Sequence, residues 1–414
     1  MRRSLEVLLG DTLVGRLAED GEGRASFRIS EDYRRLSRRP VLSQSFEDDL
    51  SKVYRGRRDA LPAFFANLVP EGPLRELIET SLQLTHGDEM ALLESVGQDL
   101  PGAVELRPGS GEPEEVGGSL DEELPTPDTS TADGGLLRFS LAGVQLKFSV
   151  LREGEKLTLP VRGERGEWIV KLDSSRFPHV VENEYATLEW ARAAGFEVPE
   201  CHLEPVDALS PSLRRHAHPE GRVLVIRRYD REGRRRIHQE DFAQVAGLAP
   251  RLKYEHVTYE QLARLVKEIA GLDEYFEFVR RLAFVVASGN NDAHLKNWSL
   301  LYPDRIEARL TPLYDQVSTV GWPELAPELA LKLAGMKNFR QLEERLFSRL
   351  ALVAGCDPVQ TLAILHDCLE GLAQAWSEST APQIMPVDHA AALRTYWASS
   401  PLLKRHRPPK FLAT

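Results

Sequence analysis

The sequence lacks the features that a disulfide framework, a cysteine-bound metal or a membrane span would require. Its 414 residues include only three cysteines, which are widely separated and form no CxxC pair: Cys201, Cys356 and Cys368. Neither a structural zinc site nor a set of disulfides is therefore indicated. No apolar run approaches the length of a membrane span, and Glu6 lies where a signal peptide would need an apolar segment. We therefore expect a cytoplasmic protein with no membrane contact.

An excess of positive charge is also absent. Lys and Arg number 52 against 63 Asp and Glu, so the formal net charge is −11. The basic runs at residues 34–39 and 234–236 are short, and such runs are usually solvated surface. The whole molecule is therefore not predicted to bind nucleic acid through its own charge. A hydrophobic fraction of 42% and a length that allows two or three domains indicate a globular protein.

The apolar pattern divides the chain into unlike parts. Short apolar runs separated by glycine turns predict an antiparallel sheet within residues 4–30, and helical spacing follows at residues 63–96. These elements make a first α+β unit, residues 1–107. Gly, Pro, Ser, Asp and Glu then dominate residues 108–134, which we interpret as a linker. Residues 135–230 are strand-rich and contain one clear helix.

The remainder, residues 231–414, is mainly helical. Strands are expected within the middle part at residues 136–140, 145–150, 168–172, 198–199 and 222–226, with a helix at 183–194. Further helices are expected at residues 259–269, 272–287, 323–333, 339–352, 358–377 and 388–397. The sequence therefore predicts an α+β, bilobal protein-kinase-like fold with a strand-rich N-lobe, a helical C-lobe and an added small N-terminal α+β subdomain.

The stretch NDAHLKN at residues 291–297 is the most informative part of the chain. Asp292, four intervening residues and then Asn297 repeat the spacing of a kinase catalytic loop, where the aspartate takes the hydroxyl proton and the asparagine holds a metal ion. Asp315 comes eighteen residues later, after two apolar runs that predict a β-hairpin. Asn297 and Asp315 could therefore share a magnesium ion. Residues 289–292 could equally form an ordinary turn, but the hairpin and the second acid favour phosphoryl transfer.

Other parts of a nucleotide site can be assigned around this loop. Residues 140–147 lie between two predicted strands and could cover the phosphates, although they contain a single glycine. Lys171 ends a strand just before a helix that carries Glu184, which repeats the lysine–glutamate pair of kinases. An edge-strand lysine that points to water is the alternative. Residues 226–229 would form the hinge that binds adenine, and His294 could reach the nucleotide or only hold the loop's shape.

Taken together, these motifs resemble the HipA family of bacterial toxin kinases. The stretches that carry the resemblance are residues 139–147, 228–231, 238–244 and 291–297. The first unit is similar to the family's N-terminal subdomain, notably in the motifs NLVPEG at residues 67–72 and LPGAV at residues 100–104. The resemblance covers nearly the whole chain, and the order of the motifs is more specific than any one of them.

The resemblance implies a serine/threonine protein kinase that uses ATP and Mg²⁺. Asp292 is then the catalytic acid/base, and Asn297 and Asp315 hold the metal. The implied nucleotide-binding residues are Ala142, Gly143, Val144, Gln145, Leu146, Lys147, Lys171, Arg227, Arg228, Tyr229, His294, Leu295, Lys296, Asn297, Tyr314 and Asp315. Ser140 falls where the family autophosphorylates, and a phosphate there would repel ATP and pull the loop out of the site.

The resemblance also implies partners. The protein would be the toxic half of a toxin–antitoxin pair, whose usual antitoxin is a small helix-turn-helix (HipB-like) dimer that makes most of the DNA contact. Family substrates include aminoacyl-tRNA synthetases, whose phosphorylation halts translation and brings on dormancy. Arg227 departs from the acidic hinge residue that family members can carry, and residues 108–134 form a long acidic linker. A catalytically silent antitoxin-binding module and a kinase for a small molecule or lipid are the alternatives.

Overall fold

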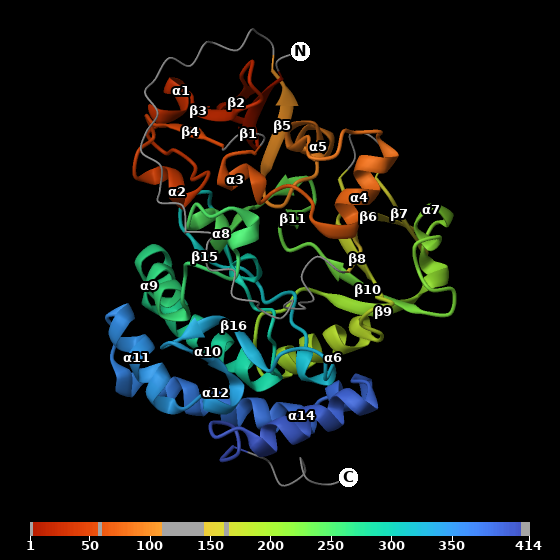
Figure 1. Cartoon of the computed structure of the whole chain (residues 1–414), viewed down its shortest axis with the longest axis vertical. Helices are drawn as coiled ribbons and strands as arrows, with labels where there is room; N and C mark the ends of the chain where they lie inside the picture. The colour runs from red at the N-terminus through yellow and green to blue at the C-terminus, as the bar shows by residue number, and fades with distance from the viewer. Residues whose placement is uncertain (1–2, 57–59, 110–144, 161–164, 407–414) are drawn as a thin grey trace, which may run out of the picture.

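The computed structural model describes residues 3–56, 60–109, 145–160 and 165–406. Within them the chain folds around three hydrophobic cores, one in the N-terminal unit, one in the N-lobe sheet and a large one in the C-lobe that also includes the N-lobe helix at residues 180–193. Figure 1 shows the N-terminal unit at the top, the N-lobe sheet beside it and the helical C-lobe below. The protein therefore has the bilobal kinase-like α+β fold that the sequence predicts, with the additional unit placed against both lobes.

The N-terminal unit is an antiparallel sheet covered by short helices. Its strand order is β4-β3-β2-β1-β5, with β1 Ser4–Leu9, β2 Thr12–Glu19, β3 Ala25–Ile29, β4 Val53–Arg55 and β5 Val104–Pro108. The helices are α1 Glu31–Arg34, α2 Gln44–Glu47, α3 Ala63–Ala66, α4 Gly72–Ser81 and α5 Glu89–Val96. Leu17 pairs with both Leu5 and Phe27 across neighbouring strands, so one face of the sheet is apolar and forms the core.

The N-lobe is a second five-stranded sheet with one long helix. Its order is β7-β6-β8-β10-β9, with β6 Lys147–Glu153, β7 Lys156–Thr158, β8 Trp168–Leu172, β9 Cys201–Pro205 and β10 Arg222–Arg227. The helices are α6 Val180–Ala193 and α7 Pro211–Arg214, with a short 3₁₀ turn η1 Val206–Ala208. Lys147 pairs directly with Lys171 between β6 and β8, so both side chains leave the same face of the sheet.

The C-lobe combines long helices with small antiparallel sheets. The sheets contain β11 Arg231–Glu232 with β12 Arg235–Arg236, β13 His238–Asp241 with β14 Ser299–Tyr302 and β15 Arg309–Leu310, and β16 Glu328–Leu333 with β17 Met336–Asn338. The helices are α8 Phe242–Val245, α9 Tyr259–Ala270, α10 Leu272–Ser288, α11 Glu344–Ala354, α12 Pro358–Glu378, α13 Ala381–Ile384 and α14 Val387–Ser399. The 3₁₀ turns are η2 Pro250–Leu252, η3 Leu295–Asn297, η4 Thr319–Gly321 and η5 Phe339–Gln341. In the described parts of the chain, no helix is long and apolar enough to cross a membrane.

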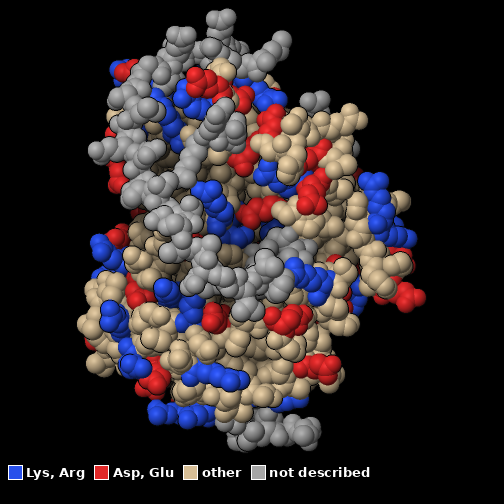
Figure 2. All heavy atoms as spheres, in the orientation of Figure 1, with Lys and Arg blue, Asp and Glu red and all other residues tan. Residues whose placement is uncertain are grey.

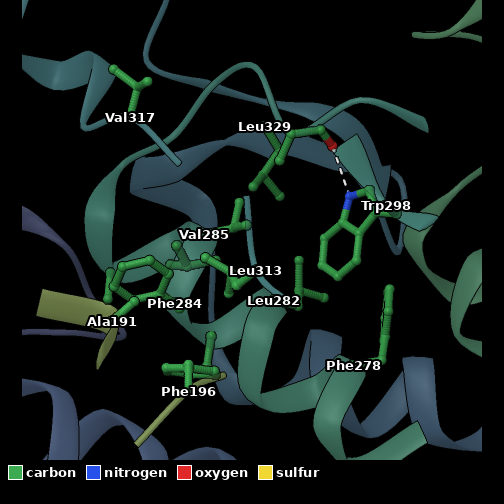
Figure 3. Close-up of a cluster of buried hydrophobic side chains, with 14 of the residues drawn as sticks. Ala191, Phe196, Phe278, Leu282, Phe284, Val285, Trp298, Leu313, Val317 and Leu329 are labelled. Atoms are coloured by element: carbon green, nitrogen blue, oxygen red, sulfur yellow. Dashed lines mark hydrogen bonds between the residues drawn. The ribbon is translucent and has the colours of Figure 1, made fainter. Parts of the chain in front are cut away.

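The largest core supports the loop that carries the proposed base. Figure 3 shows Phe278 and Leu282 of α10 beside Trp298, which directly follows that loop. The rings of Phe278 and Trp298 are 4.7 Å apart, and Nε1 of Trp298 donates a hydrogen bond to the carbonyl of Ala293 at 3.2 Å. Leu313, also in Figure 3, belongs to the same core and lies two residues before Asp315. The core therefore fixes both chain segments from which the proposed catalytic and metal-binding residues extend.

One predicted helix, at residues 323–333, is wrong. The structure has a turn followed by strand β16, which pairs with β17 through a two-residue connection. Ala334 and Gly335 in this connection both have positive φ, of 48° and 85°, as a tight hairpin turn requires. Pro327 lies inside the expected helix and would remove a backbone hydrogen bond there. Apolar residues of β16 instead enter the C-lobe core.

Several element boundaries also differ from the predicted ones. The expected helix at residues 339–352 begins with the 3₁₀ turn η5 and becomes α-helical only at Glu344. The expected strand at residues 198–199 begins instead at Cys201, because the chain is still leaving α6 before that point. The expected strand at 136–140 and most of the expected linker, residues 110–134, lie outside the described residues.

Candidate active site

The loop between α10 and β14 is closed by its own hydrogen bonds. Gly289 ends α10 with a left-handed φ of 62°, and a Cβ there would lie 2.5 Å from Val320. The carbonyl oxygen of Asp292 accepts hydrogen bonds from the backbone N–H of His294 at 2.7 Å and from Nδ2 of Asn297 at 2.8 Å. Asp292 and Asn297 are therefore held together by the loop itself, as the catalytic-loop spacing predicts.

The carboxylate of Asp292 lies in a dry environment. The residue is 8% exposed, and Oδ1 accepts a hydrogen bond from the hydroxyl of Tyr254 at 2.6 Å. Burial raises the pKa of Asp292 to about 7, although the Tyr254 hydrogen bond and the charge of Lys253 act in the opposite direction. A carboxylate with a pKa near neutrality is well matched to accept a proton from a hydroxyl group.

His294 and Leu295 have different positions within the same loop. The Nδ1 atom of His294 is buried without a hydrogen-bond partner among the described residues, and its ring meets Tyr254 edge-on at 4.9 Å. Burial and the charges of Lys253 and Lys296 lower the pKa of His294 well below its usual value, so the ring is neutral. Leu295 is fully buried in the C-lobe core. Leu295 can therefore offer a ligand only its backbone, whereas His294 has a free polar atom.

An ion-pair cluster lies on the N-lobe side of the site. Nζ of Lys171 is 2.5 Å from Oε1 of Glu184 and also contacts the carboxylate of Asp315. Nζ of Lys147 lies 3.7 Å from the other oxygen of Asp315, as the β6–β8 register allows. Glu184 is thus confirmed as the glutamate that pairs with Lys171. Burial alone would raise the pKa of Asp315, but Lys171 and Lys147 outweigh burial and hold it well below its usual range.

Asn297 and Asp315 flank the two ends of the predicted hairpin, which Tyr314 joins. Strands β14 and β15 pair as expected, and the hydroxyl of Tyr314 then donates to the carbonyl of Lys296 at 2.9 Å and lies 2.6 Å from the hydroxyl of Ser299. Asp315 has a positive φ of 50°, a strained conformation for a residue with a side chain and one that is common at functional sites. The hairpin therefore brings the segment that carries Asp315 back to the end of the catalytic loop.

These residues fit a magnesium ion bound together with a nucleotide. The Oδ1 atom of Asn297 accepts no hydrogen bond from the described residues, because the amide uses Nδ2 to contact Asp292. No group of three or more His, Cys, Asp or Glu among the described residues could hold a metal ion alone. One carboxylate and one amide oxygen leave most of the coordination to phosphates and water, which is the usual arrangement for Mg²⁺ in kinases.

The hinge residues bind mainly to protein. The backbone N–H of Arg227 donates to the carbonyl of Glu200 at 2.8 Å, and the Arg227 side chain is exposed. The guanidinium of Arg228 is buried in ion pairs with Asp230 and Asp99, both at 2.9 Å. Arg228 therefore faces the N-terminal unit, and its backbone N–H also bonds to protein, at the carbonyl of Glu167 2.9 Å away.

The last hinge residue, Tyr229, faces the end of the hairpin. Its ring lies 5.9 Å from that of Tyr314, and its hydroxyl donates to Oε1 of Gln239 at 2.6 Å. Burial raises the pKa of Tyr229, so the hydroxyl stays protonated. The hinge and the metal-ligand hairpin are therefore in contact through two aromatic rings.

Part of the predicted phosphate loop lies outside the described residues: Ser140, Ala142, Gly143 and Val144. Of the remainder, Nε2 of Gln145 donates to the carbonyl of Leu172 at 3.0 Å, and Leu146 packs against the N-lobe core. Lys147 is the member that reaches the ion-pair cluster. The described end of the loop is therefore attached to strand β8 beside Lys171.

Sequence reasoning missed a contact from the N-terminal unit. Glu71 lies between Lys296 of the catalytic loop and Lys253, with Nζ–Oε distances of 2.6 and 2.7 Å. Burial alone would raise the pKa of Glu71, but the two lysines outweigh it and lower the pKa to about 2. The NLVPEG motif that contains Glu71 was the available signal, but no spacing rule connects it to residues about two hundred positions away. The contact of Tyr254 with Asp292 was missed too, because Tyr254 lies in a charged segment that contains no recognisable motif.

Models of two protein families match the chain. The HipA N-terminal domain matches residues 5–107, and the HipA-like C-terminal domain matches residues 139–376. Among known proteins, a putative kinase of Sinorhizobium fredii, Y4dM, is 36% identical over 380 residues, which cover 90% of this chain and 91% of that protein. The serine/threonine-protein kinase toxin HipA of Shewanella oneidensis is 26% identical over 368 residues, 80% of this chain and 78% of that one.

A solved structure shares the fold over almost the full length. It is the complex of Shewanella oneidensis HipA, HipB and operator DNA, with a TM-score of 0.74 and 21% identity over 97% of this chain and 96% of the matched one. The fold, the two family matches and the full-length relatives agree with the motif order in the sequence. The chain therefore belongs to the HipA family of serine/threonine-protein kinase toxins.

Proposed function

We propose that this kinase transfers the γ-phosphate of ATP, bound with Mg²⁺, to a serine or threonine hydroxyl of a protein concerned with translation. The observation that carries the proposal is the arrangement of two aspartates. Asp292 lies in the loop beside Asn297, and Asp315 lies opposite with Lys171 and Lys147. One site thus offers a proton acceptor, oxygen ligands for a cation and ammonium groups for phosphates.

Each group has one task in this proposal. Asn297 and Asp315 hold the metal ion, which when bound neutralises charge on the phosphates. Lys171 and Lys147 turn from Asp315 towards the phosphates, and Glu184 keeps Lys171 in place. The hydroxyl oxygen of the substrate serine or threonine bonds to the γ-phosphorus, and the bond between that phosphorus and ADP breaks. Asp292 accepts the proton that the hydroxyl loses. Retention of all these groups supports catalysis over a silent antitoxin-binding module.

The decisive experiment is intact mass spectrometry after incubation with Mg²⁺ and ATP. We expect phosphate to be added to the unmutated chain and not to Asp292→Asn. An unmutated chain that starts unphosphorylated and gains no mass would overturn the proposal. Labelling of an added metabolite alone, with no protein labelled, would favour a small-molecule kinase.

We also propose that Ser140 is the site of self-inactivation. The support is its position in the sequence, directly before the segment that leads to Lys147. Ser140→Ala should lose the added phosphate and keep its activity for longer in a time course with ATP. A variant that labels itself as fully as the unmutated chain would show that the regulatory serine lies elsewhere.

A helix-turn-helix antitoxin dimer of the HipB kind is the proposed partner, with DNA bound mainly by that partner in the cytoplasm. The Shewanella structure contains HipA, HipB and operator DNA. The net charge of −11 opposes direct DNA binding, and basic and acidic side chains are interspersed on the face in Figure 2. Gel-shift assays with the neighbouring operator should show a band of lower mobility only when the antitoxin is present. An aminoacyl-tRNA synthetase is the first protein substrate to test.

A further inference from the structure

One acidic side chain of the N-terminal unit touches the catalytic loop. Glu71 directly precedes α4, and its two carboxylate oxygens bind different lysines, Oε1 to Lys296 at 2.6 Å and Oε2 to Lys253 at 2.7 Å. Nζ of Lys296 also donates to the carbonyl of Asn67 at 3.1 Å. Both lysines are largely buried, so their charges need a partner close by.

Each of these lysines is next to a residue that holds Asp292. Lys253 precedes Tyr254, whose hydroxyl donates to the Asp292 carboxylate, and Lys296 precedes Asn297, whose amide donates to the Asp292 carbonyl. The two segments are also joined directly, because the backbone N–H of residue 295 donates to the carbonyl of Lys253 at 3.1 Å. Glu71 therefore connects the two chain segments that orient the proposed base.

The position of Glu71 is itself fixed from both sides. Leu74 and Leu77 of α4 pack against the N-lobe core. Nδ2 of Asn67 donates to the carbonyl of Leu248 in the C-lobe at 2.8 Å, and Gln244 Nε2 donates to the carbonyl of Phe64 at 3.1 Å. Figure 1 shows α3 against α8 and α4 beside the N-lobe strands. The segment that carries the Glu71 carboxylate is therefore held in place by contacts with both lobes.

We propose that Glu71 is a positioning residue for phosphoryl transfer, which fixes Lys253 and Lys296 so that Tyr254 and the catalytic loop hold Asp292 in its reactive orientation. The proposal rests on the kinase activity proposed above. It makes the N-terminal unit a working part of the active site. Without Glu71, Lys253 loses the carboxylate that it binds at 2.7 Å and can pair with Asp292, on which its charge already acts; that pair would occupy the oxygen that must accept the proton.

The helix that follows Glu71 offers a matched control. Glu79 of α4 also binds two basic side chains, Arg75 at 2.8 Å and His86 at 2.7 Å, but both belong to the N-terminal unit. Glu79→Gln therefore removes an acid of the same type, eight residues further along the chain, without touching the catalytic loop. Glu71→Asp keeps the charge and shortens the side chain by one methylene.

The test measures the initial rate of phosphate transfer from Mg-ATP, to the chain itself and to dephosphorylated casein, with the full-length protein. Glu71→Gln should lower kcat on the order of a hundredfold, the usual effect of misplacing a catalytic group, and leave the KM for Mg-ATP within about twofold. The kcat of Glu71→Asp should lie between those of Glu71→Gln and the unmutated chain. The kcat of Glu79→Gln should equal that of the unmutated chain. Circular dichroism of each variant reports its folding.

A double-mutant cycle supplies the second readout. Tyr254→Phe removes the hydrogen bond to Asp292 and leaves Glu71 in place. Both changes remove support from the same group, the carboxylate of Asp292. The kcat of the double variant should therefore be no lower than that of Glu71→Gln alone. Multiplicative losses, an unchanged kcat in Glu71→Gln, or an equal loss in Glu79→Gln would each overturn the inference. If Glu71→Gln does not fold, Glu71→Asp takes its place in the cycle. An unmutated chain that transfers no phosphate would instead overturn the proposed function, and this inference with it.

Discussion

The two sides of the site treat a buried aspartate in opposite ways. On the C-lobe side, Asp292 accepts a hydrogen bond from the hydroxyl of Tyr254, and burial raises the pKa of Asp292 to about 7. On the N-lobe side, Asp315 contacts Lys171 and Lys147, which lower its pKa although burial acts to raise it. A site that separates the pKa values of two carboxylates in this way assigns them different chemistry. The first suits proton transfer, and the second suits a cation.

Removing the carboxylate on the C-lobe side should have the largest effect. Asp292→Asn deletes the proposed proton acceptor, and loss of a general base lowers the rate by about 10³-fold. The affinity for Mg-ATP should not change, because the amide keeps the size and position of the carboxylate. Radiolabel transfer and calorimetric titration with Mg-ATP separate the two effects. A variant with weakened ATP binding would place Asp292 with the metal ligands instead.

Asp315→Asn should show the converse pattern. The amide cannot neutralise Mg²⁺ or Lys171, so the Kd for Mg-ATP should rise at least tenfold, the scale at which such changes act on metal sites. Calorimetry with Mg-ATP measures this directly, and titration with ATP in the presence of EDTA is the control. Equal Kd values for the variant and the unmutated chain would remove Asp315 from the metal site.

The rate of transfer should depend on pH in a way that nucleotide binding does not. Asp292 must be ionised to accept a proton, and a pKa near 7 means that its ionised fraction falls about tenfold for each pH unit below that value. Initial rates at saturating Mg-ATP should therefore rise between pH 5.5 and about 7 and then level off. The Kd for Mg-ATP should show no such step, because Asp315 is ionised throughout. A flat rate profile would contradict the difference between the two aspartates.

A third buried acid tests whether a raised pKa by itself marks a base. Glu240 is 1% exposed at the joint between the N-terminal unit and the C-lobe, where it accepts hydrogen bonds from Ser43 at 2.5 Å and Tyr302 at 2.6 Å. Burial raises its pKa to about 7. Glu240→Gln should leave the rate of transfer close to that of the unmutated chain, because no catalytic group contacts Glu240 within the described residues.

The same variant should change the stability instead. A folded-state pKa above the unfolded value of 4.5 gives stability that is complete below pH 4.5 and is lost as the pH rises to about 7, by roughly 3 kcal/mol at most. Urea denaturation at pH 5.5 and 8 should show this loss in the unmutated chain and a smaller one in Glu240→Gln. Equal losses in both proteins would assign the pH dependence to other groups.

Local pattern was enough to predict the elements that position the two aspartates. Strand β8 has the predicted bounds, α9, α10, α12 and α14 agree to within two residues, and the hairpin after Asn297 is present. These succeed because hydrophobic periodicity and turn residues act over short distances. The strand at β16 was missed because its burial against the C-lobe core outweighs a helical spacing that Pro327 already weakens.

The contacts between elements could not be predicted in the same way. Glu71 meets Lys296 from 225 positions away, and Lys171 meets Asp315 from 144 positions away. Such pairs depend on how helices and strands pack together in the tertiary structure, which the spacing of residues in the sequence does not predict. The Lys171–Glu184 pair was predictable because the two residues lie only 13 positions apart on a strand and the helix that follows it.

The arginines that follow the hinge limit which N-terminal units this protein could acquire in evolution. Arg228 and Arg231 each bind Asp99 of the N-terminal unit, and Arg236 donates to the carbonyl of Gly102. A Cβ on Gly102 would lie 2.7 Å from the backbone N of Gln239, so this loop is fitted to the lobe it touches. Residues 1–107 are therefore not an exchangeable module. A chimera with a relative's N-terminal unit should be soluble and active only if the donor also has the acid at position 99 and the glycine at position 102.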